Sequence, residues 1–257
     1  MKWSGSVAII TGASRGIGRA VATAAARKGA RVGLIARSED ELAELLKECD
    51  GNGAVAACDV GDRQALERAI ASLGAELGPV GILINNAGVG AYARIADTSV
   101  ETFETMMRIN LLGSLYATKA VLPGMIERAQ GHIVNIASIN GRIGAPMEGG
   151  YSASKFALAG LSEAMRFELA PRGIGVSLIN PGPVATGFFD ARGVPYKRAF
   201  PRPVKPERIA AAVIRAVEAN QAEVFIPRWL RFPPILKVVA PPLYRSGTGR
   251  SFREELR

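Results

Sequence analysis

Short apolar runs alternate with longer amphipathic or alanine-rich segments along most of the chain, and this alternation is what most restricts the fold. The apolar runs cover residues 7–10, 31–36, 54–58, 80–84, 132–137, 174–179 and 223–226. Helical periodicity between them covers 38–49, 62–77, 99–129, 151–171 and 206–220. Nearly continuous apolar strands separated by helices are typical of a parallel sheet with helices on both faces. We therefore predict an α/β fold around a seven-stranded, mainly parallel sheet.

A chain of 257 residues could form one such domain or two smaller ones. No internal repeat or low-complexity linker divides it, so we predict a single Rossmann-like, doubly wound domain over residues 1–226. Residues 227–257 form a basic, apolar C-terminal extension, with four prolines after Pro227. Residues 185–204 lack periodicity and predict a long loop. Thr98 with Glu101 predicts a capped helix start.

Composition excludes several classes of function. Two cysteines, Cys49 and Cys58, are too few and too far apart for a disulfide framework or a zinc site, and we expect no metal. The lone His132 precedes a predicted strand, and we expect a structural role at its edge. We predict a cytoplasmic protein, because the first strand leaves no room for a signal peptide and no apolar run is long enough to span a membrane.

The net charge of +9 is uneven, since the last 31 residues contribute +5. No run of five or six basic residues occurs, and basic residues do not interleave with aromatic ones along the body of the chain. A nucleic-acid partner is therefore not expected.

The first predicted strand, 7–10, runs into the glycine-rich segment 11–18, which opens an alanine-rich helix. Strand, glycine turn and helix form the context that a phosphate-binding loop requires. Gly12 suits the tight turn, Gly16 lets the backbone approach a pyrophosphate, and Gly18 lets helix and strand pack closely. A plain glycine turn is the alternative, and the position after the first strand disfavours it.

Tyr151 and Lys155 lie one helical turn apart, with Ser138 at the end of the apolar run 132–137. An ammonium group near a phenol favours the phenolate, so we predict that Lys155 lowers the pKa of Tyr151 toward the working range of an acid–base catalyst. Ser138 could donate a hydrogen bond to a carbonyl group held by the tyrosine. Taken alone, a Tyr–Lys pair at this spacing is also common on a solvated helix face.

Together these motifs resemble the classical short-chain dehydrogenase/reductase family over roughly residues 6–226. The resemblance rests on 11–18 (TGASRGIG), Asp59-Val60, 85–88 (NNAG), Asn110, Ser138, 151–155 (YSASK) and Pro181-Gly182. It implies that Tyr151 is the general acid or base, that Lys155 also holds the nicotinamide ribose, that Ser138 polarises the carbonyl and that Asn110 holds a water linking Lys155 to solvent.

The resemblance also implies a dinucleotide cofactor. The implied contacts are Gly12, Ser14, Arg15, Gly16, Ile17, Gly18, Arg37, Asp59, Val60, Asn86, Ala87, Gly88, Tyr151, Lys155, Pro181, Gly182, Val184 and Thr186. The carboxylate that would bind the ribose 2′-hydroxyl of NAD about 20 residues past the loop is absent. Arg37 and Arg15 instead predict NADP, because two guanidinium groups suit one phosphate.

The leading hypothesis is an NADP(H)-dependent oxidoreductase that interconverts a ketone and a secondary alcohol, with a lipophilic substrate and with pocket walls from residues 139–150 and 185–204. A 3-oxoacyl carrier-type reductase is the alternative within this class. From another class, a non-catalytic NADP-sensing protein is disfavoured by the complete Asn110, Ser138, Tyr151 and Lys155 set. We expect a small-molecule substrate and a homodimer or homotetramer.

The C-terminal extension mixes basic and aromatic residues, and its prolines exclude a spanning helix. The favoured interpretation is that its apolar side chains cover the domain or a subunit interface. A weak contact with an anionic membrane surface, which would make the protein peripheral, is the alternative. In either case we expect the extension to border the substrate entrance.

Overall fold

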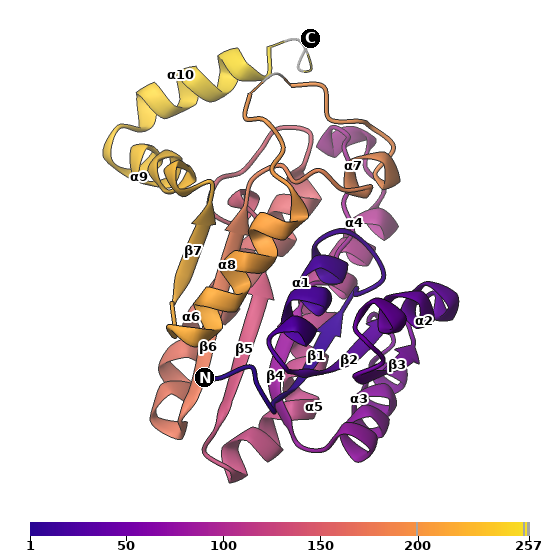
Figure 1. The fold of residues 1–257 in the computed structure, drawn as a ribbon. Helices are drawn as coiled ribbons and strands as arrows, with labels where there is room; N and C mark the ends of the chain where they lie inside the picture. The colour runs from indigo at the N-terminus through magenta and orange to yellow at the C-terminus, as the bar shows by residue number, and fades with distance from the viewer. Residues whose placement is uncertain (199, 254, 256–257) are drawn as a thin grey trace.

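The computed structural model describes residues 1–198, 200–253 and 255, and its seven strands form one sheet (Figure 1). Each strand overlaps one predicted apolar run. The strands are β1 Val7–Thr11, β2 Arg31–Ala36, β3 Gly53–Ala57, β4 Val80–Asn85, β5 Gly131–Ile136, β6 Ile174–Pro181 and β7 Glu223–Ile226. All neighbouring strands are parallel, so the predicted mainly parallel sheet is confirmed.

The strand order is β3-β2-β1-β4-β5-β6-β7. The chain winds outward from β1 in one direction and then returns to start β4 on its other side. The order therefore reverses between β1 and β4, and such a switch point leaves a crevice at the carboxyl ends of the strands where ligands bind. The glycine-rich segment follows β1 and the 85–88 segment follows β4, so both motifs meet at this crevice.

Helices cover both faces of the sheet, as predicted. One face packs against α1 (Gly16–Arg27), α2 (Glu39–Glu48) and α8 (Pro206–Glu218). The other packs against α3 (Arg63–Leu77), α5 (Gly113–Glu127) and α6 (Gly149–Leu169). Shorter elements are η1 Ile95–Asp97, α4 Val100–Met107, η2 Arg108–Leu112, η3 Ile139–Gly141, η4 Ala170–Arg172, α7 Phe188–Ala191, η5 Arg228–Arg231, α9 Phe232–Val239 and α10 Pro241–Ser251.

Strand β1 shows why its sequence is continuously apolar. Ala8 and Ile10 lie in the core beneath α1 and α8, whereas Val7 and Ile9 lie in the core beneath α3 and α5. Successive side chains of a strand point to opposite faces, so a strand covered on both faces needs apolar residues at every position.

Three sequence-based expectations need correction. His132 lies inside β5 and is buried, rather than preceding the strand. The α4 helix is capped by Ser99, whose side chain accepts from Thr102 N, and not by Thr98. The predicted loop 185–204 contains the four-residue helix α7, which is too short to show periodicity.

The predicted helix over 99–129 is broken by η2, a π-helical turn over Arg108–Leu112 that joins α4 to α5. A π turn holds one more residue than an α turn and is frequent at functional sites. Asn110 lies at its centre.

The C-terminal segment forms η5, α9 and α10 beyond the carboxyl ends of β6 and β7 (Figure 1). Both α9 and α10 carry proline at their first helical positions, where the missing N–H costs nothing. The prolines therefore start helices there instead of only interrupting the chain. Within the described residues, no helix combines the length and apolar character needed to cross a bilayer.

Candidate active site

A cavity of about 920 Å³ opens at the carboxyl ends of the strands. Most of the predicted site residues line it: Gly12, Arg15, Gly16, Ile17, Arg37, Asn86, Ala87, Gly88, Ser138, Tyr151, Lys155, Pro181, Gly182, Val184 and Thr186. Ser14, Gly18, Asp59, Val60 and Asn110 are not among the lining residues. The cavity also extends along residues 139–148, 186–198 and 200–201, so the predicted pocket walls are largely where we expected them.

The glycine-rich loop is packed too closely for side chains. Gly12 has φ +62°, and a Cβ added there would lie 2.7 Å from Ala87 Cα. Gly16 has φ +55°, and its Cβ would meet Thr186 Cγ2 at 2.9 Å. A Cβ on Gly18 would lie 2.2 Å from the carbonyl oxygen of Gly12. The first two glycines adopt left-handed conformations that favour glycine, and all three keep the loop close to the segments after β4 and β6.

The loop is braced by Asn86 at the end of β4. Its Nδ2 donates to the carbonyl oxygens of Thr11 and Gly12, both at 3.0 Å. The loop then opens α1, whose N-cap residue Arg15 makes no side-chain capping bond. The first N–H groups of a helix that has no cap are available to an anion, and the helix dipole favours negative charge there. The loop therefore fits a dinucleotide pyrophosphate.

The two arginines predicted to bind the 2′-phosphate differ in their surroundings. Arg15 is highly exposed, and its Nε donates to Glu41 Oε1 at 2.9 Å. Glu41 lies in the first turn of α2, which the sequence-based argument did not connect with Arg15. Arg37 follows β2 and is exposed, and within the described part of the chain it has no ion-pair partner. Arg37 is therefore the more available of the two cations.

Asp59 and Val60 follow β3, away from the cavity lining. Asp59 is exposed, and its Oδ1 accepts from Gly61 N at 2.8 Å. Val60 is buried, and a Cβ on Gly113 would meet its carbonyl oxygen at 3.0 Å. In this structure the two residues hold the turn between β3 and α3 against the start of α5.

Tyr151, Lys155 and Ser138 meet at the cavity, with Tyr151 and Lys155 one turn apart on α6. Burial raises the pKa of the Tyr151 phenol above its usual value, and Glu148 raises it further, while a hydrogen bond with Ser138 and the charge of Arg192 lower it. The predicted lowering of this pKa by Lys155 is therefore wrong for this structure. The phenol keeps its proton at neutral pH.

The position of the Lys155 ammonium explains the difference. Nζ donates to the carbonyl oxygen of Ile136 at 2.9 Å and lies 5.7 Å from the centroid of the Tyr151 ring. Burial lowers the pKa of Lys155 to about 8, because a charged group loses hydration in an apolar environment.

Asn110 joins three elements from inside the π turn. Its Oδ1 accepts from Val89 N at 2.8 Å, and its Nδ2 donates to Val89 O and Ser154 Oγ, both at 2.9 Å. A Cβ on Gly88 would lie 3.3 Å from Asn110 Oδ1 and 3.5 Å from Lys155 Nζ. Asn110 thus fixes the loop after β4 beside Lys155.

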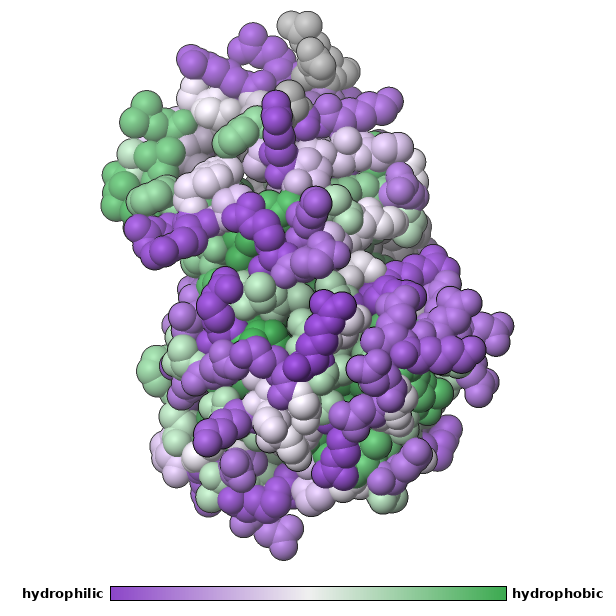
Figure 2. Space-filling model, viewed as in Figure 1, coloured by the Kyte–Doolittle hydropathy of each residue, from purple (hydrophilic) through white to green (hydrophobic). Residues whose placement is uncertain are grey.

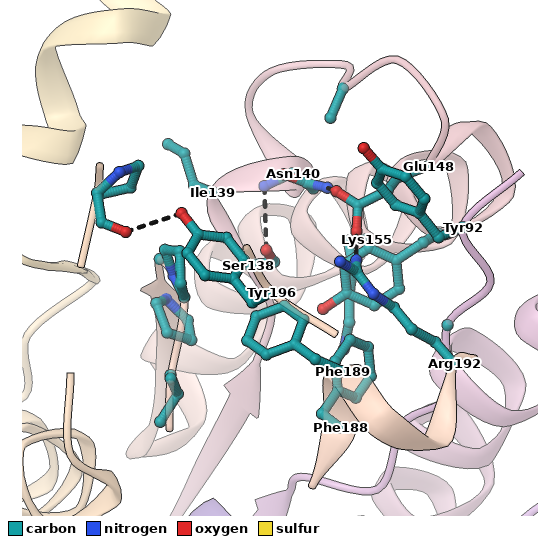
Figure 3. A pocket seen from close by; sticks show the side chains of 18 of the residues that line it. Tyr92, Ser138, Ile139, Asn140, Glu148, Lys155, Phe188, Phe189, Arg192 and Tyr196 are labelled. Atoms are coloured by element: carbon teal, nitrogen blue, oxygen red, sulfur yellow. Dashed lines mark hydrogen bonds and ion pairs between the residues drawn. The ribbon is translucent and has the colours of Figure 1, made fainter. Parts of the chain in front are cut away.

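Sequence reasoning did not identify a buried polar cluster beside Tyr151. Glu148 and Arg192 form an ion pair whose side chains are 16% and 5% exposed. Asn140 Nδ2 donates to Glu148 Oε2 at 2.8 Å, while Asn140 N donates to Ser138 Oγ at 3.1 Å (Figure 3). Glu148 and Arg192 are 44 residues apart, so no local pattern could have indicated the pair.

Aromatic rings surround this cluster. The Arg192 guanidinium lies 4.6 Å from the Tyr92 ring centroid and 4.7 Å from that of Phe189 (Figure 3). The Phe188 ring lies 5.5 Å from that of Tyr151, and the Phe189 ring 5.0 Å from that of Tyr196. The part of the cavity next to the phenol thus combines aromatic walls with one polar corner.

Comparison with known proteins gives a consistent result. A family model described as short chain dehydrogenase matches residues 6–194. The chain is 39% identical over 226 residues to glycine betaine reductase of Emericella nidulans, and the match covers 83% of this chain but only 18% of that much longer protein. It is 35% identical over 232 residues to 3-ketodihydrosphingosine reductase of Bos taurus, covering 84% of this chain and 70% of that protein.

Solved structures agree in fold. A single-substitution variant of actinorhodin polyketide ketoreductase with NADPH is 33% identical, with a TM-score of 0.78 over 86% of this chain and 94% of that one. A short chain dehydrogenase/reductase from Burkholderia phymatum in complex with NAD is 26% identical, with a TM-score of 0.86 over 95% of this chain and 96% of that one.

Proposed function

Because this chain belongs to the short-chain dehydrogenase/reductase family, we propose that it reduces a lipophilic ketone to a secondary alcohol with NADPH. The chain is an oxidoreductase of the short-chain type. The observation that carries the proposal is the half-buried Tyr151 phenol, which lies with Ser138 and Lys155 at the wall of the large cavity.

Each of the three side chains has a group suited to its proposed role. Tyr151 keeps its proton at neutral pH and can give it to a carbonyl oxygen as general acid. Ser138 Oγ already accepts from Asn140 N, so its own O–H is the group left to donate to the same oxygen. We propose that Lys155 holds the nicotinamide ribose and that Asn110, through a water, returns a proton to the site.

The residues present fit a dinucleotide, since the glycine loop and the uncapped start of α1 offer the backbone groups that a pyrophosphate needs. NADPH, once bound, supplies a hydride. Gly12, Gly16 and the other predicted contacts would hold it, with Asp59 and Val60 proposed for the adenine. We propose NADP over NAD because Arg37 is exposed at the cavity with no ion-pair partner among the described residues. The similar structures include complexes with either cofactor.

The walls of the cavity support a lipophilic substrate. Aromatic and aliphatic residues line it from the phenol outward to the C-terminal helices: Phe188, Phe189, Tyr196, Phe200, Trp229, Leu230, Pro233, Leu236, Leu243 and Phe252. The similar protein of Bos taurus is named 3-ketodihydrosphingosine reductase, and reduction of a ketone agrees with this proposal. A homodimer or homotetramer stays a prediction.

Replacing Tyr151 by phenylalanine tests the proposed reaction. A panel of ketones with NADPH, followed at the nicotinamide absorbance, identifies a substrate. Tyr151→Phe should then lower turnover by about 10²–10⁴-fold while NADPH affinity stays within about twofold, because the ring remains. Tyr116→Phe, on α5 outside the cavity lining, is the matched control and should keep wild-type turnover. A Tyr151→Phe variant with more than half of the wild-type turnover would exclude Tyr151 as the acid.

Fluorescence titration with NADPH and NADH tests the cofactor. A charged hydrogen bond to phosphate contributes about 1.5–3 kcal/mol, so NADPH should bind roughly tenfold to a hundredfold more tightly than NADH. Arg37→Asp should remove or reverse this preference, whereas Arg27→Asp, at the far end of α1, should leave it unchanged. Equal affinities in the wild type would contradict the NADP assignment.

A further inference from the structure

The C-terminal helices expose a large apolar surface. Phe232, Ile235, Leu236, Val238, Val239 and Leu243 are between 40% and 78% exposed. Neither α9 nor α10 has a single buried residue, so neither helix is held by a core of its own. The favoured sequence-based interpretation is that these side chains cover the domain or a subunit interface. The exposure of Val238 and Val239 argues against the first, and the second stays a prediction. We call this set of six residues the apolar patch. Figure 2 shows it as a green area over α9.

The segment that carries the apolar patch has charges of one sign as far as residue 253. Residues 227–253 contain five arginines and one lysine, and no aspartate or glutamate. Arg231 ends η5 directly before α9, and Lys237 lies on α9 with its ammonium 5.0 Å from the centroid of the Phe156 ring. A symmetric dimer through this surface would bring the cations of one copy near those of the other, because the segment carries no acidic residue up to position 253, and like charges across an interface disfavour association. The patch therefore suits a partner that is apolar and anionic.

The same segment lines the cavity. Leu236 of α9 and Leu243 of α10 are exposed, and both are also cavity-lining residues. Trp229, which stacks on Phe200 at a centroid distance of 5.1 Å, lies on the same wall. The outer part of the cavity is therefore continuous with the apolar patch.

We propose that the apolar patch docks on the surface of an anionic lipid bilayer, so that lipophilic substrates enter the cavity from the lipid. Apolar side chains would lie at the boundary between headgroups and acyl chains, and the basic residues would contact anionic headgroups. The docking follows from exposure and charge alone. The delivery of substrate rests on the proposed function.

Vesicle flotation tests the docking without any enzymatic readout. The wild-type protein should float with phosphatidylcholine vesicles that contain phosphatidylserine, at least about tenfold more strongly than with phosphatidylcholine alone, and added salt should release it. The double variant Val238→Ser/Val239→Ser should lose most of this binding. Neither residue lines the cavity and both are more than 70% exposed, so the fold should be unaffected. Phe167→Ser, a 73% exposed site on α6, is the matched control and should float like the wild type.

Three results would overturn the proposal. The first is a wild-type protein that floats with neither kind of vesicle. The second is a double variant Val238→Ser/Val239→Ser that binds vesicles as well as the wild type. The third is a double variant that still floats but sediments as a smaller assembly than the wild type, which would make the patch a subunit interface.

A kinetic comparison separates docking from reduction. Phosphatidylserine vesicles should raise kcat/KM for a long-chain ketone in the wild type and not in the double variant, while a short water-soluble ketone should respond in neither. If no ketone is reduced at all, the proposed function fails and flotation still decides the docking.

Discussion

Removing Arg192 should destabilise the protein strongly, because it leaves the Glu148 carboxylate beside Tyr151 without its cation. The two side chains are only 5% and 16% exposed. Removing one partner of a buried ion pair costs about 3–5 kcal/mol of folding stability. The hydrogen bond that Asn140 donates to Glu148 still stabilises the carboxylate, so we expect a loss of about 3 kcal/mol. Arg192→Met keeps packing volume between the two aromatic rings, so the loss reports mainly on charge.

Urea unfolding at neutral pH, followed by circular dichroism, measures this loss. The double variant Arg192→Met/Glu148→Gln should recover to within about 1 kcal/mol of the wild type, since no buried charge remains. Arg63–Glu67 on α3 is the matched control, with side chains 67% and 40% exposed, and Arg63→Met should cost only about 0.3–0.5 kcal/mol. If Arg192→Met costs no more than Arg63→Met, or if the double variant recovers nothing, the reasoning is wrong.

Two further predictions concern stability. Burial lowers the pKa of His132 from 6.5 to about 4, with smaller contributions from the N-terminal amine and Arg166. Between these two pH values the unfolded chain therefore binds a proton at His132 that the folded chain does not bind. About 3 kcal/mol of folding stability should be lost as the pH falls from 6.5 to about 4. Urea unfolding measured at these two pH values should show a smaller loss for His132→Gln than for the wild type. Gly18→Ala should lower the melting temperature and weaken cofactor binding, because its Cβ would lie 2.2 Å from the Gly12 carbonyl oxygen. Gly160→Ala, where nothing lies within 4 Å, should be neutral or slightly stabilising, and equal melting temperatures for the two variants would refute the packing argument.

The sheet was predictable because each strand is buried on both faces and so carries a continuous apolar run. The residues at which strands end were less predictable, because a strand boundary depends on which backbone N–H and C=O groups form hydrogen bonds with a neighbouring strand. The C-terminal helices were missed because proline was taken as a breaker, although Pro241 occupies a first turn where its ring fits. The π turn at Asn110 was missed because the α-helical pattern of 99–129 continues on both sides of it.

Within the candidate site, the motif residues could be found because the chemistry of each depends on local spacing. Tyr151 and Lys155 share a helix, and Gly12 and Gly16 share a loop. Interactions across the fold could not be found in this way. The contact of Arg15 with Glu41, the pairing of Arg192 with Glu148 and the position of the Lys155 ammonium against Ile136 O all depend on how separate elements pack. The direction of the Tyr151 pKa shift was wrong for the same reason, because burial outweighed the neighbour in sequence.

The π turn at Arg108–Leu112 makes chain length between α4 and α5 a fixed quantity. A π turn holds one more residue than an α turn, so a one-residue deletion that restored an α turn would leave α4 and α5 in nearly the same relative rotation but would shift the residues inside the turn around the helix axis. Asn110 would then turn away from Val89, and the loop beside Lys155 would lose its anchor. Substitutions on the exposed side of this segment should be tolerated, whereas insertions and deletions should not. The number of residues between α4 and α5 is therefore as important for the active site as the identity of Asn110.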